Sequence, residues 1–220
     1  MKMKKKKITE LYLSIGFLSA FIIWTIALTI FDVSAIGPNH SKVGFSRLNE
    51  FIRELVGVNF TLYTITDWLG LVPIGVALGF AVLGLIQLVK RKSILKVDKN
   101  LLILGTFYIV VITVYLLFEN VVINFRPVLI NGYLEASYPS STTMLVTCVM
   151  PTSIMQLNAR VKNKVIKNCI VYTMVMFIVF MVVGRVLSGV HWFSDVVGGL
   201  LLSAGLVIGY HFFVHTFINK

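Results

Sequence analysis

Two segments of this chain carry residue types that could do chemistry. His191 and Asp195 are four residues apart. A helix that begins near Ser194 would place both on one face, where a carboxylate can hold one imidazole nitrogen and leave the other free as base or nucleophile. Arg185 precedes this pair, and Arg126 lies in an earlier segment. A lone His–Asp pair at a helix start is more often structural, but two arginines at the same membrane depth favour a functional site.

The segment between the two arginines offers a further anion site. It reads Tyr-Pro-Ser-Ser-Thr-Thr from Tyr138 to Thr143. Proline followed by hydroxyl residues is typical of a helix start, where Ser or Thr caps free amides. The same amides can instead bind an anion. Taken alone, this segment is explained by capping, so its role depends on where the arginines lie.

Membrane-crossing helices must position these residues. Hydrophobic residues make up 57% of the 220 residues and charged residues 13%, which excludes an ordinary soluble domain. Six stretches lack Asp, Glu, Lys and Arg, and each approaches the roughly 20 residues that cross a bilayer as a helix. They are Leu11–Phe31, Trp68–Val89, Leu101–Phe118, Ala136–Ala159, Asn168–Gly184 and Val196–Asn219. We therefore predict an all-α polytopic membrane protein of about six transmembrane helices, with residues 1–220 forming a single domain.

The basic residues predict the orientation of the chain. The net charge of +11 could suggest nucleic acid as a partner, but 15 of the 20 Lys and Arg fall in four clusters that six crossings would place on one side. These clusters are the tail of residues 2–7, Lys90–Lys99, Arg160–Lys167 and Lys220. By the positive-inside rule that side is the cytoplasm. We expect both termini in the cytoplasm of a cell-membrane protein, the candidate site on the extracellular side, and no nucleic-acid partner.

An outer interfacial segment, residues 32–67, follows the first predicted helix. Apolar residues recur in it at helical spacing from Phe45 to Val56, with Arg47, Glu50 and Arg53 between them. This pattern predicts an amphipathic helix in the outer interface, with a solvated linker as the alternative. Such a helix would cover a site between the transmembrane helices.

The remaining metal-type residues suggest no metal site. Cys148 and Cys169 both fall in apolar runs, which indicates buried small residues rather than a disulfide framework. His211 and His215 are four apart, but no acidic or thiol residue is near them in the sequence. We interpret both histidines as interfacial.

The chain resembles the type 2 phosphatidic acid phosphatase (PAP2) superfamily of lipid phosphatases. The residues that match are Arg126-Pro127, Pro139-Ser140 and Arg185-x5-His191-x3-Asp195, in that order. The family motifs read K-x6-R-P, P-S-G-H and S-R-x5-H-x3-D. The resemblance is close over residues 119–195, and the helix layout extends it to a core of about residues 68–218. It implies phosphoryl transfer from a membrane lipid phosphate or pyrophosphate through a phosphohistidine, without metal or cofactor.

The resemblance also implies a role for each matched residue. His191 would attack phosphorus, and Asp195 would orient it and balance its charge. Arg126 and Arg185 would bind the non-bridging oxygens. Amides of the segment containing Ser140, Ser141 and Thr142 would assist.

Three positions depart from the family motifs. Glu119 stands where the family has lysine, Gly184 where it has serine, and Thr142 where it has the histidine that protonates the leaving group. General acid catalysis is typically worth about 10²–10⁴-fold, so Thr142 should penalise poor leaving groups. Glu119 and Glu135 are candidate modulators, since either could act as a substitute acid, and Glu119 could instead pair with an arginine.

Three functions fit these observations. The first is a phosphatase that prefers lipid pyrophosphates over lipid monoesters. The second is a catalytically silent relative that binds lipid phosphates or regulates a partner. The third is a small transporter, which the scarcity of polar residues in the middle of the helices disfavours. We expect the first, and the sequence does not reveal the oligomeric state.

Overall fold

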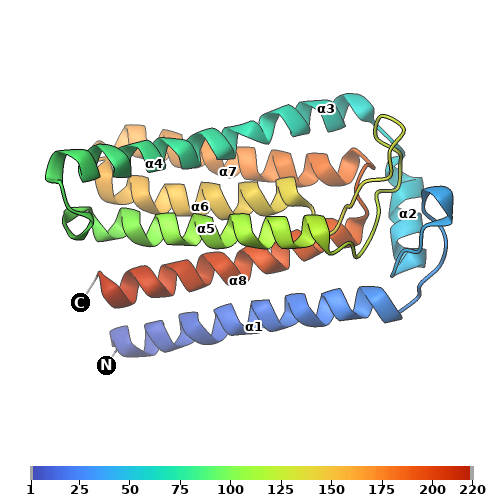
Figure 1. Cartoon of the computed structure of the whole chain (residues 1–220), viewed down its shortest axis with the longest axis horizontal. Coiled ribbons are helices and arrows are strands. Elements are labelled where there is room, and N and C mark those ends of the chain that lie inside the picture. Colours follow the sequence, from blue (N-terminus) through green and yellow to red (C-terminus); the bar gives the residue numbers. More distant parts are fainter. Residues whose placement is uncertain (1, 219–220) are drawn as a thin grey trace.

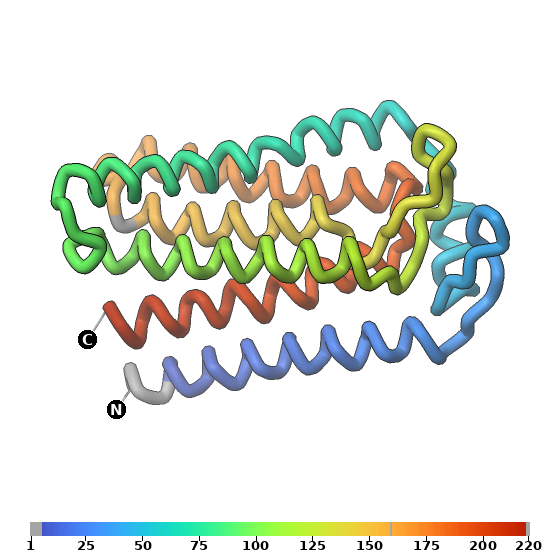
Figure 2. Tube along the Cα trace, in the orientation of Figure 1, coloured from blue at the N-terminus to red at the C-terminus, as the bar shows by residue number. Residues whose placement is uncertain are grey.

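Long helices packed side by side form the molecule (Figures 1 and 2). The computed structural model describes the backbone of residues 2–218 and the side chains of residues 6–158 and 160–218. The predicted basic tail and Lys220 therefore lie partly outside the described residues. The α-helices are α1 (Lys2–Ile30), α2 (Ser46–Val56), α3 (Phe60–Leu69), α4 (Leu71–Arg91), α5 (Lys99–Asn120), α6 (Ser141–Arg160), α7 (Lys164–Leu187) and α8 (Phe193–Phe217). Two short 3-10 helices, η1 (Pro38–His40) and η2 (Ile94–Lys96), lie in loops.

The predicted fold class is confirmed. Within the described chain, five helical segments are long and apolar enough to cross a membrane, and they are Lys6–Ile30, Phe60–Arg91, Lys99–Asn120, Lys164–Leu187 and Phe193–Phe217. The second segment joins α3 and α4 through Gly70 and starts at Phe60 rather than at the predicted Trp68. Asn59 explains the earlier start, because its side chain caps the helix by accepting a hydrogen bond from the Leu62 amide at 2.9 Å.

The sixth long helix, α6, differs from the predicted run Ala136–Ala159. Residues 136–140 are not helical, because Ser140 caps the helix and its amide donates to the Asp195 carbonyl at 3.0 Å. Helix α6 is also not among the segments apolar enough to cross a membrane on composition alone. It contacts α4, α5, α7 and α8, so protein rather than lipid surrounds it. Buried Thr152, Ser153 and Gln156 are therefore tolerated in it.

Helix α2 lies across the end of the bundle, as Figure 1 shows. Its polar Ser46 and Asn49 are buried against the protein, while Leu48, Phe51 and Leu55 are exposed. This arrangement reverses the usual one in a soluble protein and suits a helix whose apolar face meets lipid. The predicted amphipathic helix is thus present, with its apolar face directed away from the bundle.

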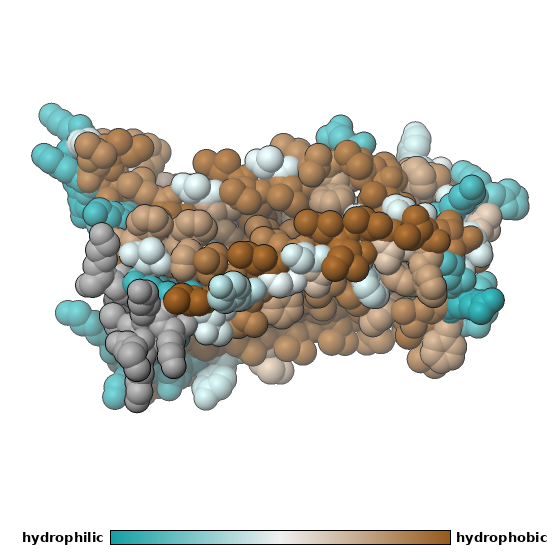
Figure 3. Space-filling view, turned by 90° about the horizontal axis from the view of Figure 1, so that it is seen from below, coloured by the Kyte–Doolittle hydropathy of each residue, from teal (hydrophilic) through white to brown (hydrophobic). Residues whose placement is uncertain are grey.

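Hydrophobic residues cover the middle of the face seen in Figure 3, and hydrophilic residues gather mainly at the two ends. Both ends of the described chain lie at one end of the bundle (Figure 1), as an even number of crossings requires. Helix α1 packs along α8, where Ser14 Oγ donates to the Gly205 carbonyl at 2.8 Å. A Cβ at Gly205 would approach Leu18 Cγ to 2.8 Å, so a glycine here lets the two helices meet.

Candidate active site

The predicted site residues meet at the end of the bundle opposite the chain termini. The loop of residues 121–140, the start of α6, the end of α7 and the start of α8 converge there, with α3 alongside (Figure 1). His191, Asp195, Arg185 and Thr142 are buried, and the Arg126 side chain is 11% exposed. Two segments distant in sequence, the loop with the start of α6 and the junction of α7 with α8, thus place these side chains in one region.

His191 is held as one neutral tautomer. Its Nε2 lies 3.2 Å from Arg126 Nη1, and its Nδ1 lies 3.2 Å from the Ser137 carbonyl oxygen. Arginine can only donate and a carbonyl can only accept, so Nε2 carries the lone pair and Nδ1 the proton. Burial, together with the positive charges of Arg126 and Arg185, lowers the pKa of His191 well below its ordinary value. The imidazole is therefore neutral at neutral pH and its nucleophilic nitrogen faces Arg126.

Asp195 does not make the hydrogen bond to His191 that its spacing suggested. Asp195 Oδ2 lies 3.8 Å from His191 Nδ1. The carboxylate instead accepts from the Trp192 amide at 3.0 Å and from Asn124 Nδ2 at 3.1 Å. The Ser137 carbonyl, rather than Asp195, fixes the histidine tautomer. At 3.8 Å, Asp195 is still close enough to balance positive charge that develops on the ring.

Arg126 is positioned by the loop that contains Glu135. The Arg126 amide donates to the Glu135 carbonyl at 3.0 Å, and Arg126 Nε lies 3.1 Å from Glu135 Oε2. The angle of this second contact does not make it a hydrogen bond, so the buried Nε–H lacks a partner. Glu135 therefore balances the charge of Arg126 while leaving the Nε donor free.

Arg185 is the most buried cation of the site, with its side chain 1% exposed. Its Nη2 donates to Asp67 Oδ1 at 2.8 Å and also to Thr142 Oγ1. Its Nε and Nη1 are buried and have no hydrogen-bond partner among the described residues. Leaving buried charged donors unpaired is costly, so these two N–H groups are suited to an anion. The Asp67 side chain is 55% exposed, so an incoming anion can readily displace it.

Tyr63 of α3 connects the two arginines. Its ring centre lies 5.6 Å from Arg126 Cζ and 5.1 Å from Arg185 Cζ. Both guanidinium groups thus contact one aromatic ring, an interaction worth about 0.5–2 kcal/mol for each cation. Tyr63 orients both cations without using their N–H groups. The unpaired donors, Arg126 Nε and Arg185 Nε and Nη1, therefore remain available for an anion.

The three predicted residues at the start of α6 differ in what they can offer an anion. Ser140 is fully buried, its amide donates to the Asp195 carbonyl and its hydroxyl contacts Thr143 Oγ1 at 3.0 Å. Ser140 therefore shapes the loop rather than binding an anion, contrary to expectation. Ser141 and Thr142 occupy the first turn, where amides have no intrahelical acceptor. The Thr142 hydroxyl is occupied by Arg185.

Glu119 does not pair with either arginine in the structure. It lies at the end of α5 and lines, with His191, Tyr115 and Ser141, a small cavity of about 20 Å³. Its carboxyl group thus lines the same small cavity as His191. Gly184, another departure, packs against α3: an added Cβ would lie 2.8 Å from Thr66 Cγ2. Thr66 therefore fills the space that a serine side chain would need.

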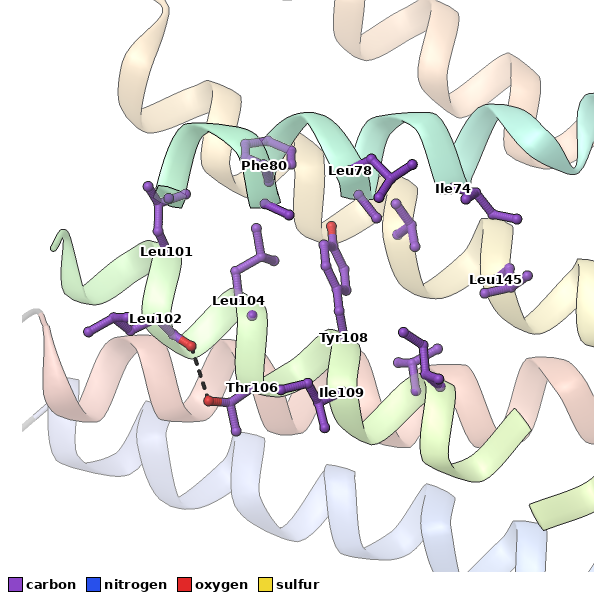
Figure 4. A pocket seen from close by; sticks show the side chains of 17 residues that line it. Ile74, Leu78, Phe80, Leu101, Leu102, Leu104, Thr106, Tyr108, Ile109 and Leu145 are labelled. Carbon is purple, nitrogen blue, oxygen red and sulfur yellow. Dashed lines mark hydrogen bonds between the residues drawn. The ribbon is translucent and has the colours of Figure 1, made fainter. Parts of the chain in front are cut away.

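Two cavities of about 570 and 640 Å³ are apolar and lie away from the site. One of about 570 Å³ is lined by α4, α5 and α6, including Leu78, Phe80 and Tyr108 (Figure 4). It lies within the membrane-crossing part of the bundle, where lipid chains can fill it. The candidate site is therefore identified from the polar cluster around His191 and not from the size of a cavity.

Sequence reasoning missed three residues of the site, which are Tyr63, Asp67 and Asn124. Asp67 and Tyr63 were assigned to the outer segment, although both belong to α3. One signal was available for Asp67, since an acid beside the start of an apolar run is a candidate functional residue. Asn124 lies in a loop, and no local pattern indicates its contact with Asp195.

Comparisons with known proteins agree with this geometry. The model of the PAP2 superfamily matches residues 101–219. A solved structure, described as the first transmembrane PAP2 type phosphatidylglycerolphosphate phosphatase from Bacillus subtilis, superposes with a TM-score of 0.59. The two chains are 21% identical, and the match covers 94% of this chain and 98% of that one. At this identity the likeness concerns the fold. No curated protein sequence matches the chain.

Proposed function

This chain belongs to the PAP2 superfamily, and from that premise we propose that it is a lipid phosphatase acting through a phosphohistidine on His191, with a preference for lipid pyrophosphates. One observation carries the proposal. The lone pair of His191 Nε2 faces Arg126, 3.2 Å away, and the nearby Arg185 has two buried N–H groups without partners. A neutral nucleophile beside unpaired guanidinium donors fits phosphoryl transfer, which depends on positioning and on cations at the equatorial oxygens.

In the proposed reaction, the phosphate oxygens bind the free N–H groups of Arg126 and Arg185 and draw Arg126 away from His191. The Nε2 lone pair then forms a bond to phosphorus while the bond to the leaving oxygen breaks. The Nδ1 proton stays on the ring, directed at the Ser137 carbonyl. The positive charge on the phosphorylated ring is balanced by Asp195, 3.8 Å away. Water then cleaves the P–N bond, releasing phosphate and the free histidine.

The substrate preference follows from the leaving group. A lipid monoester releases an alkoxide, which needs a proton in the transition state, whereas a lipid pyrophosphate releases a phosphate anion that is stable by itself. Thr142 occupies the position of the family's general acid and cannot supply that proton. Its hydroxyl also accepts a hydrogen bond from Arg185. Threonine in place of a general acid also fits the second candidate function, a silent lipid-phosphate-binding protein, because a hydroxyl group is too weak an acid to protonate an alkoxide leaving group efficiently.

Purified protein in detergent should release phosphate from a lipid pyrophosphate, such as a polyprenyl pyrophosphate, faster than from phosphatidic acid. The initial rate at low substrate concentration measures kcat/KM for each. Addition of EDTA should leave both rates unchanged, since the proposed steps use protein groups alone. Binding of both lipids without turnover would reject the phosphatase in favour of the silent protein. Absence of both binding and turnover would reject both.

We also propose that the site faces the outside of the cell membrane and that both termini are cytoplasmic. In a Cys169→Ser background, cysteines replacing Arg47 or Tyr133 should react with an impermeant maleimide in intact cells. A cysteine replacing Leu95 should react only after the cells are opened. The side chain of Arg47 is 94% exposed, and Tyr133 and Leu95 are 74% and 87% exposed. Labelling of position 95 but not 47 or 133 in intact cells would reverse the orientation.

A further inference from the structure

A second cluster of chemically competent side chains lies at the end of the bundle that carries both termini. Glu10 of α1 meets His211 and His215, which share one face of α8. Glu10 Oε1 is 3.1 Å from His211 Nδ1, and Oε2 is 3.4 Å from His215 Nδ1. Our interpretation of the histidines as interfacial assumed that no acid was near them. Folding overturns that assumption, because Glu10 is remote in sequence and adjacent in space.

We propose that Glu10, His211 and His215 form a zinc-binding site. Two imidazoles and one carboxylate are a ligand set that Zn²⁺ takes, with one position left for water. Ligands placed tetrahedrally at about 2.0–2.2 Å from zinc lie about 3.3–3.6 Å from one another. The nitrogen–oxygen distances, 3.1 Å from His211 to Glu10 Oε1 and 3.4 Å from His215 to Glu10 Oε2, are close to that range. All three ligand atoms lie within 4.8 Å of one another, so small side-chain movements suffice.

The electrostatics of the cluster also indicate a cation. Glu10 is 8% exposed, and its Oε2 is buried without a hydrogen-bond partner. A buried carboxylate is costly unless it is paired. Protonated histidines could pair with it, but the ring centres of His211 and His215 are only 3.9 Å apart. Two positive rings at that distance repel each other, whereas one divalent ion would bind both neutral rings and the carboxylate.

A cavity adjoins the cluster. A cavity of about 280 Å³ is lined by both histidines together with Asn100, Gln156 and Asn158. It provides room for a hydrated ion to approach and for the water that completes its coordination. The three ligands come from α1 and α8 alone, and neither the arginines nor His191 take part. We infer that bound zinc would fasten α1 to α8 and contribute to stability rather than to phosphoryl transfer.

Zinc binding can be measured on the full-length protein in detergent, after removal of any purification tag and of metal by EDTA. Calorimetric titration with ZnCl₂ should give one ion per chain, and the ion should raise the Tm in proportion to ln(1 + [Zn²⁺]/Kd). His211→Ala and Glu10→Gln should each weaken binding by more than the about 10–100-fold that loss of an outer-shell partner costs. His40→Ala, which removes an exposed histidine of the opposite end, should bind like wild type.

Cobalt provides a second test that does not depend on folding of the variants. Co²⁺ added to wild type should give the intense visible absorption of a tetrahedral complex, and Zn²⁺ should displace it. Failure of wild type to bind zinc, an octahedral cobalt spectrum, or unchanged affinity in well-folded His211→Ala would overturn the proposal. Phosphate release from lipid pyrophosphate is measured separately. Failure of zinc binding can therefore be told apart from failure of the proposed phosphatase activity.

Discussion

Replacement of His191 by alanine is expected to lower phosphate release by about 10⁴-fold or more, because it removes the atom that forms the bond to phosphorus. The effect should appear in kcat with both substrate classes, since both use the same nucleophile. Rates of phosphate release from a lipid pyrophosphate measure it. The alanine variant should still bind substrate through the buried donors of Arg185, so binding without turnover is the expected signature.

Two controls accompany this variant. His40→Ala removes a histidine outside the site and should keep the wild-type rate. Asp195→Asn should retain the hydrogen bond with the Trp192 amide but lose the negative charge 3.8 Å from the ring, so a smaller decrease is expected. A His191→Ala variant with wild-type turnover would end the phosphohistidine mechanism, whatever the other variants do.

The pH profile reports the same histidine in the wild-type protein. Burial and the two arginines hold the pKa of His191 well below its usual 6.5. The neutral nucleophile should therefore persist below pH 6.5, and kcat/KM should fall only in more acidic solution. Stability follows the same sign. The unfolded chain gains this proton near pH 6.5, so the free energy of unfolding decreases as the pH drops below that value.

Replacement of Thr142 by histidine is expected to raise kcat/KM for phosphatidic acid by about 10²–10⁴-fold, the usual worth of a general acid. Much less gain is expected for a lipid pyrophosphate, whose leaving anion needs no proton. The ratio of the two kcat/KM values is the measurement, because it cancels differences in the amount of active protein. The wild-type ratio should favour the pyrophosphate.

A matched variant separates the new acid from the loss of a contact. Thr142 also accepts a hydrogen bond from Arg185, so any substitution frees that guanidinium group. Thr142→Val removes the contact without adding an acid and should leave the substrate ratio unchanged. Equal gains from valine and histidine would assign the effect to Arg185. A wild-type ratio near one, unmoved by histidine, would show that the leaving group is protonated by another residue, and Glu119, which lines the same small cavity as His191, would be the candidate to replace next.

Much of the fold could be predicted because lipid imposes a simple rule on sequence. Apolar runs located α1, α5, α7 and α8 closely. The rule failed at α6, whose neighbours are other helices, so its polar residues cost little and its start is set by Ser140 rather than by hydropathy. It also placed the start of the second span too late, because the polar residues of α3 interrupt the run without ending the helix.

The site was predictable only where a local pattern exists. The spacing of His191, Asp195 and Arg185 predicted that these residues share a site. The order of the family motifs predicted that Arg126 belongs to it as well. The contacts of Tyr63, Asp67 and Asn124 join segments far apart in the chain, and only Asp67, an acid beside an apolar run, carries a local signal. The roles of Ser140 and Asp195 changed for a related reason. Their backbone and side-chain partners depend on how α6 meets α8, which spacing within either segment does not determine.

Helix α2 gives the site an unusual dependence on its surroundings. Asn49 Nδ2 donates to Ser194 Oγ at 2.9 Å and its Oδ1 accepts from the Ser194 amide at 3.1 Å, so α2 grips the start of α8 beside His191. The apolar side of α2 makes little contact with the rest of the protein, since Phe51 and Leu55 are 61% and 73% exposed. We expect those side chains to insert among lipid acyl chains and so to hold α2 in position. Lateral pressure and lipid packing in the adjoining leaflet should therefore affect how firmly α2 holds the start of α8 and the neighbouring His191. A micelle and a flat bilayer need not hold His191 equally firmly.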